Sequence, residues 1–287
     1  MPADNGTNFH RPCIMNTTVT PLPAAAYRAL PDGRFASSEL TRGPWSDAHQ
    51  HAGPPVALVC RAVRLAAAAH GLTHIARVTA NLLRPVPLGV LAVEVSEDYV
   101  GRNAGHFSAR LLADGKEVAR CTLLVQRELE VALPHDLPGH PLPLAPRAPE
   151  ASPEAEFPFA GRVVGYADLV QTRLAAGRLW HGPCAVWFRL RTPLVEGEQP
   201  GPCERVAVAA DSGNGISAVL DYQRYTFVNS DLTINLLRPA QGEWICLEAS
   251  TAWGPHGGGL AQSRLYDERG LVGHATQSLA VRLRAPD

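Results

Sequence analysis

Thr79-Ala-Asn-Leu-Leu-Arg-Pro85 recurs 154 residues later as Thr233-Ile-Asn-Leu-Leu-Arg-Pro239. The same offset relates pairs of identical residues further along: Glu94 and Glu248, Ser96 and Ser250, Leu111 and Leu265, Val118 and Val272, and Thr122 and Thr276. A constant offset over about 45 residues indicates two copies of one supersecondary unit, with no net insertion between equivalent strands. The sequence therefore predicts a duplicated fold.

The first copy is predicted to contain a helix and four strands. His51-Ala-Gly-Pro-Pro55 precedes a run of good helix formers over 56–69, and Gly71 is a stop signal. Strand-like runs follow at 78–83, 90–95, 107–112 and 117–126, after an earlier one that begins at Phe35. Asp114-Gly115 is a two-residue hairpin turn. A central helix followed by an antiparallel meander predicts an α+β fold whose sheet curls round the helix, the hotdog arrangement.

The second copy repeats this pattern after a linker. Eight prolines between Pro134 and Pro158 predict an extended connector. The later elements expected are strands at 187–191, 231–237, 244–250, 259–266 and 271–284, and a short helix at 203–210. We therefore expect an N-terminal hotdog at 20–130, a linker at 131–160 and a C-terminal hotdog at 161–287, each hotdog with its own core. The first 20 or so residues are predicted to be a loose leader.

Composition narrows the class of protein. The 287 residues are 46% apolar and 18% charged, which is typical of a globular chain. The net charge of -1 gives no general attraction to nucleic acid or to an anionic membrane. The six cysteines, which include Cys13, show no disulfide or zinc-binding spacing. With no signal peptide or membrane span in the pattern, we expect a cytoplasmic protein without metal or cofactor.

The order and spacing of several motifs resemble the acyl-CoA thioesterase II (TesB-like) family of double-hotdog proteins. The motifs are Gly43-Pro-Trp45, His51-Ala-Gly-Pro-Pro55 and Asn81-Leu-Leu-Arg-Pro85, then Trp187-Phe-Arg-Leu-Arg191, Ala210-Asp-Ser-Gly-Asn-Gly215, Asn235-Leu-Leu-Arg-Pro239 and Ala275-Thr-Gln-Ser278. The resemblance covers roughly residues 24 to 286. It implies hydrolysis of an acyl thioester, carried by coenzyme A or a carrier protein, by an activated water molecule.

The resemblance also implies a site of an Asp, a Thr or Ser, and a Gln in the second hotdog. The Asp falls on Asp211 and the Gln on Gln277. The hydroxyl position falls on or beside Asn229, which departs from the pattern because an amide is not a hydroxyl. Thr233 and Ser230 are the neighbouring hydroxyls that could replace it.

Asp211 and Gln277 also have support from the residues themselves. Asp211 follows the short helix, where the negative end of the helix dipole makes a carboxylate a better proton acceptor, although an Asp in such a stretch is also ordinary turn chemistry. Gln277 corresponds at the repeat offset to Leu123. A Gln between apolar runs needs a buried partner or a water. This asymmetry predicts that the second half alone kept the chemistry.

Substrate-binding roles are predicted for His51 and Gly53, at a helix start whose free N–H groups could bind a thioester oxygen or a phosphate, and for Gly213 after Asp211. A purely structural role for the first two is equally compatible. Arg84 and Arg238 could meet the phosphates of coenzyme A, but their repetition favours a structural role. A metal pair at His49 and His51 has no third ligand with suitable spacing.

Other function classes fit less well. Gly213-Asn-Gly-Ile-Ser-Ala218 imitates a dinucleotide-binding fingerprint but lacks surrounding βαβ units. No nucleophile elbow or phosphate-binding Walker loop occurs. A hotdog hydratase or dehydratase would need a His/Asp pair, and we expect no His near Asp211. A non-catalytic acyl-CoA or acyl-carrier binding protein is the alternative from another class. Self-association into a homo-oligomer is expected because hotdog sheets commonly extend edge to edge.

Overall fold

The computed structural model describes residues 21–134, 136–157 and 163–284. The predicted leader, Cys13, linker residues 135 and 158–160 and the last three residues lie outside this range. Within it, no helix is long and apolar enough to cross a membrane. No group of three or more His, Cys, Asp or Glu side chains in the described ranges could hold a metal ion.

The N-terminal half has the predicted helix and meander. Its elements are β1 (Tyr27–Ala29), β2 (Phe35–Ser37), η1 (Glu39–Thr41), α1 (Gly53–Ala68), β3 (His74–Leu82), β4 (Val90–Val100), β5 (Ala104–Ala113) and β6 (Lys116–Gln126). Two prolines occupy the first turn of α1, where a missing N–H costs little. Asp114 and Gly115 have φ of 48° and 72°, as a type I′ hairpin turn requires.

The C-terminal half repeats this plan with a shorter central helix. Its elements are α2 (Tyr166–Leu169), β7 (Val170–Gly177), β8 (Cys184–Leu190), α3 (Pro202–Ala210), α4 (Gly213–Ile216), β9 (Tyr225–Asn229), β10 (Asp231–Leu236), β11 (Ile245–Trp253), β12 (Gly258–Asp267) and β13 (Gly270–Leu283). The predicted helix and the five predicted strands of this half are all present. The sequence pattern does not indicate β7 and β9.

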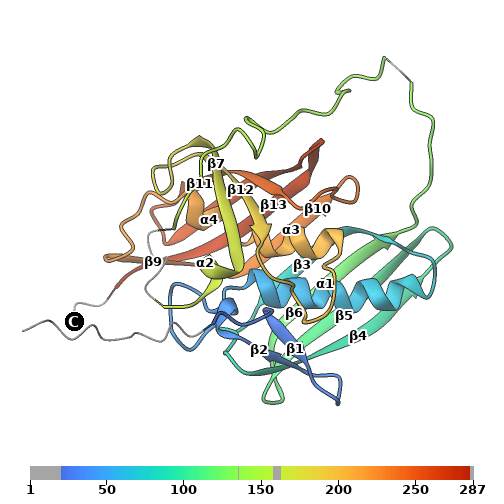
Figure 1. Ribbon diagram of the computed structural model, residues 1–287, viewed down its shortest axis with the longest axis horizontal. Coiled ribbons are helices and arrows are strands. Elements are labelled where there is room, and N and C mark those ends of the chain that lie inside the picture. The colour runs from blue at the N-terminus through green and yellow to red at the C-terminus, as the bar shows by residue number, and fades with distance from the viewer. Residues whose placement is uncertain (1–20, 135, 158–162, 285–287) are drawn as a thin grey trace, which may run out of the picture.

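One sheet runs through both halves (Figure 1). The strand order is β1-β2-β4-β5-β6-β3-β10-β13-β12-β11-β8-β7, with β9 paired to the far end of β13. The two halves join where β3 pairs antiparallel with β10, with Thr79 opposite Thr233. The fold is therefore the expected double hotdog, with its two sheets fused edge to edge at the repeated stretch.

The prediction of a separate core for each half is wrong. The largest cluster of buried apolar side chains runs through both halves, because α1 packs directly against α3 (Figure 1). The two helices are antiparallel, since Arg64 near the end of α1 bonds Glu204 at the start of α3. The sulfur of Cys60, in the middle of α1, lies 3.7 Å from the sulfur of Cys203, the second residue of α3. The two repeats thus share one core.

The described part of the linker has neither helix nor regular strand, and main-chain oxygens of this segment accept hydrogen bonds from the second half. Pro143 O accepts a hydrogen bond from Leu271 N (2.9 Å), and Arg147 O accepts one from the indole of Trp187 (2.7 Å). Trp187 belongs to a second, smaller apolar cluster with Trp244. The linker therefore helps to cover the outside of the C-terminal sheet.

Candidate active site

Asp211 is the C-terminal cap of α3 and is only 4% exposed. The helix begins after Gly201, whose N–H donates to Glu204 Oε2 (2.8 Å). The C-terminal end of α3 faces the first turn of α1, where Gly53 contacts Asp211. Asp211 consequently lies between the negative end of α3 and the positive end of α1, two dipoles with opposite effects on its charge.

Two side-chain amides donate to the same carboxylate oxygen. Asn229 at the end of β9 donates from Nδ2 to Asp211 Oδ1 (2.8 Å). Gln277 on β13 donates from Nε2 to the same oxygen (3.2 Å) and to the main-chain oxygen of Asp211 (3.1 Å). Gln277 Oε1 in turn accepts from Asn214 N (3.0 Å). The amide of Gln277 is therefore fixed at both ends, between Asp211 and α4.

The other carboxylate oxygen contacts the N-terminal half. Gly53 N donates to Asp211 Oδ2 (3.0 Å), and His51 Nδ1 lies 3.0 Å from the same atom. A carboxylate oxygen only accepts, so His51 carries a proton on Nδ1. A protonated Nδ1 cannot accept a hydrogen bond from Gly53 N, which lies 3.3 Å away. The single hydrogen of Gly53 N is donated to Asp211 instead. The expectation that no His lies near Asp211 is wrong, because the antiparallel helices bring the start of α1 to the end of α3.

The α1 N-terminus has no spare donor for a substrate among its first helical residues. The N–H of Gly53 goes to Asp211, Pro54 and Pro55 have none, and Val56 N donates to Ala52 O. The expected binding of a thioester oxygen or phosphate by these groups therefore does not fit. The α1 N-terminus binds the carboxylate of Asp211 instead.

His51 is held in position by Tyr166. The two rings stack with centroids 3.8 Å apart and planes 3° apart. The Tyr166 hydroxyl bonds Val208 O (2.8 Å) and Ser212 Oγ (2.9 Å). Burial raises the pKa of this hydroxyl far above its usual range. The charge of Asp211 raises the pKa further, and the hydrogen bond with Ser212 lowers it. Tyr166 is therefore a neutral support for the imidazole.

Thr233 is not part of this cluster. It pairs across the sheet with Thr276, the neighbour of Gln277 along β13. Successive side chains of a strand point to opposite faces, so Thr233 and Thr276 face outward while Gln277 faces inward. Gly213, by contrast, does lie at the cluster. A Cβ on Gly213 would be 2.7 Å from Ser263 Oγ and 3.1 Å from Gln277 Oε1.

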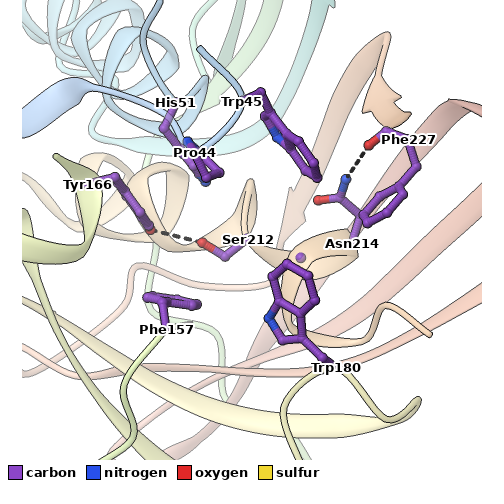
Figure 2. Close-up of a pocket in the computed structure, with 10 residues that line it drawn as sticks. Pro44, Trp45, His51, Phe157, Tyr166, Trp180, Ser212, Asn214 and Phe227 are labelled. Atoms are coloured by element: carbon purple, nitrogen blue, oxygen red, sulfur yellow. Dashed lines mark hydrogen bonds between the residues drawn. The ribbon is translucent and has the colours of Figure 1, made fainter. Parts of the chain in front are cut away.

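Two cavities meet at these residues. The larger has a volume of about 660 Å³ and extends between the loop before α1, the end of β3 and strands β9 and β13. The smaller, of about 40 Å³, is walled mainly by aromatic rings, with Trp45 and His51 on one side and Tyr166, Phe227 and Trp180 around it (Figure 2). His51 and Asn214 line both cavities, and Asp211 and Asn229 line the larger one.

Sequence reasoning did not assign Tyr166, Ser212 or Asn214 to the site. Ser212 and Asn214 belong to the quoted motif after Ala210, so the motif was a signal for them. Tyr166 follows the linker and carries no motif. Its role depends on a stacking contact that only the folded chain reveals.

Comparison with known proteins gives a consistent picture. The family model described as the acyl-CoA thioesterase N-terminal domain matches residues 41–126, and the model described as the C-terminal domain matches residues 144–281. No curated protein sequence matches the chain.

Several solved structures share the fold. A candidate thioesterase II from Thermobifida fusca YX has a TM-score of 0.70 at 16% identity, over 90% of this chain and 96% of that one. A candidate thioesterase from Novosphingobium aromaticivorans DSM 12444 has a TM-score of 0.66 at 20% identity, over 89% and 98%. A hot dog fold protein of unknown function from Alicyclobacillus acidocaldarius has a TM-score of 0.65 at 17% identity, over 92% and 97%.

Proposed function

Because this chain belongs to the acyl-CoA thioesterase family, and is therefore a thioester hydrolase, we propose that hydrolysis takes place where its two cavities meet, beside Asp211. The observation that carries the proposal is the contact of Asp211 with four polar groups from both halves of the chain. The substrate is an acyl-CoA, and the attacking group is a water molecule.

Asp211 acts mainly by holding and polarising its neighbours. A carboxylate has about four lone-pair directions, and the donors from Asn229, Gln277, Gly53 and His51 match that number. A water molecule could bond to Asp211 only by displacing one of them. The charge of Asp211 instead fixes the Nδ1 proton of His51 and stabilises the imidazolium that forms if His51 takes a proton.

His51 is the group placed to accept the proton of the water. With its proton on Nδ1, the acceptor is Nε2, which has no bonding partner among the described residues, and the ring lines both cavities. Water attack forms a bond to the thioester carbonyl carbon while its proton moves to His51. The C–S bond then breaks, and the proton is returned to the leaving thiolate.

Asn214 is the proposed donor to the thioester oxygen. Its side chain lines both cavities, and its amide nitrogen has one long hydrogen bond, of 3.5 Å, to Phe227 O (Figure 2). A second N–H of that nitrogen remains for the oxygen that becomes negative during attack. The thioester with its acyl group and pantetheine arm would occupy the larger cavity, because the aromatic pocket of about 40 Å³ has room for little more than a water molecule.

The test is release of free thiol from a panel of acyl-CoA esters, from short to long and including aromatic acyl groups. Wild type should turn over at least one ester. Asp211→Asn and Gln277→Ala should lower kcat by about 100-fold or more while leaving the fold intact. Full activity in Asp211→Asn would contradict the assignment. Saturable binding of the same esters without thiol release would indicate a non-catalytic binding protein, the alternative that Asn229 supports.

A hydratase remains the second candidate because His51 and Asp211 form the pair that such an enzyme would use. The same preparations should be incubated with 2-enoyl-CoA and with 3-hydroxyacyl-CoA. Interconversion of these two esters faster than thiol release would favour the hydratase. The cytoplasmic location and the homo-oligomer stay predictions.

A further inference from the structure

Arg84 and Arg238 occupy equivalent positions in the two repeats but have different surroundings. Arg238 forms a bidentate ion pair with Asp267, at 2.5 and 2.8 Å, and donates to Gly270 O (3.2 Å). The Asp267 side chain is fully buried. The charge of Arg238 is therefore neutralised inside the second half, and the residue has a structural role.

Arg84 has no carboxylate within ion-pair distance among the described residues. Its Nη1 donates to the main-chain oxygen of Glu117 (2.6 Å), while the Glu117 carboxylate is bonded by Arg120 at 2.6 and 2.9 Å. At the repeat offset, the position of Asp267 is held by Ala113. The first half thus kept the arginine and lacks its acid, which leaves an exposed positive charge.

This charge lies at the larger cavity. Arg84 and Arg282 both line it, both are exposed, and no described residue pairs with the guanidinium of Arg282. Asp211 is the acidic side chain among the described lining residues, and it is buried and bonded to four groups. The open part of the cavity is therefore positively charged, although the whole chain has a net charge of -1.

We propose that Arg84, with Arg282, binds the phosphate groups of coenzyme A at the open part of this cavity. This inference rests on the proposed function, which places the thioester beside His51. The cavity volume of about 660 Å³ suits a pantetheine-sized ligand. The apolar side chains of Leu83 and Val228 line it together with the two arginines. The duplicated Arg-Pro motif thus has a structural copy and a ligand-binding copy.

The test measures binding of free coenzyme A and of pantetheine by titration calorimetry, which needs no turnover. Arg84→Gln should weaken coenzyme A binding about fivefold and leave pantetheine binding unchanged, since one exposed charge contact is removed. Arg84→Lys should retain most of the affinity because Lys binds phosphate as a point charge. Arg28→Gln, an exposed arginine outside the cavity, is the matched control.

Salt gives a second readout. The affinity of wild type for coenzyme A should fall as ionic strength rises, and Arg84→Gln should show a weaker dependence. Unchanged coenzyme A affinity in Arg84→Gln, or an equal loss for pantetheine, would overturn the proposal. Thiol release by wild type, measured separately, decides the proposed function. Absence of thiol release with a selective loss of coenzyme A binding in Arg84→Gln would refute hydrolysis and support the phosphate site.

Discussion

Thr79 and Thr233, which are equivalent in the two repeats, are paired directly with each other across the β3–β10 junction. On either side of this pair, Asn81 faces Asp231 and Arg77 faces Asn235. At the repeat offset Asn81 corresponds to Asn235 and Arg77 to Asp231, so exchanging the two repeats exchanges the two pairs. This is the pattern of a local two-fold axis. The same symmetry makes α1 and α3 antiparallel, which places the start of one helix at the end of the other and creates the site between the halves.

Gly53→Ala should prevent the close approach of the start of α1 to the end of α3. A Cβ on Gly53 would lie 2.5 Å from Val208 O, a main-chain atom of α3 that cannot rotate away. The helices would have to separate, which would cost about 3 kcal/mol in the free energy of unfolding and would weaken the Gly53–Asp211 hydrogen bond. Urea denaturation measures the first effect and thiol release the second. Gly215→Ala is the control for the denaturation, because a Cβ there meets no atom within 4 Å. Equal stability of the two variants would contradict this argument.

Much of the fold could be predicted because its repeated elements carry their own patterns. The long helix and the meander strands have clear periodicity, and the duplication relates them. β9 was not predicted because the residues before it are polar and it forms by pairing with distant β13. The merged core was not predicted either, because it depends on how the two halves pack rather than on the pattern of either one.

The site could be predicted in part. Motif resemblance located Asp211 and Gln277, which the structure brings together. Thr233 was misplaced although the sequence contained the signal, since its neighbours Leu232 and Ile234 take the inner face and alternation sends Thr233 outward. His51 could not be placed beside Asp211 because the contact joins residues of different repeats. No local pattern reports such a distance.

Gly213→Ala should lower activity by moving the amide of Gln277. The new Cβ would be 2.7 Å from Ser263 Oγ and 3.1 Å from Gln277 Oε1, so one of these side chains must shift. We expect kcat to fall about tenfold, with a loss of about 1 kcal/mol in stability. Adding Ser263→Ala removes the nearer atom and should restore much of the activity. A double variant no better than Gly213→Ala would show that the glycine acts in another way.

Asn229→Asp should lower activity more at high pH than at low pH. The new carboxyl would replace an N–H that donates to Asp211 Oδ1 at 2.8 Å. Two carboxyls at this distance share a proton, so one pKa is raised. At acidic pH the protonated group can still donate, while at higher pH the two negative charges repel. The ratio of variant to wild-type kcat/KM should therefore fall as pH rises from about 5 to about 8.

The matched control for that variant is Asn229→Ser, which supplies a hydroxyl donor without a titrating charge. Its ratio to wild type should stay constant over the same pH range. A constant ratio for Asn229→Asp as well would mean that residue 229 does not act through Asp211.

Asp267→Asn should destabilise the second half and remove part of its acid sensitivity. Burial raises the pKa of the Asp267 carboxyl, but the bonds from Arg238 and two main-chain N–H groups outweigh burial and leave the pKa below its ordinary value. The folded state therefore binds this proton less readily than the unfolded state, so the stabilisation is present above about pH 4 and is lost as pH falls toward the lower folded pKa. Removing the charge should cost about 3 kcal/mol at neutral pH, because Arg238 is left without its partner.

The measurement is urea denaturation from about pH 3 to about pH 7. The free energy of unfolding should depend less on pH in Asp267→Asn than in wild type. The control Asp32→Asn, which removes an exposed ion pair, should change stability little. Parallel pH profiles for Asp267→Asn and wild type would contradict the role assigned to the Arg238–Asp267 ion pair.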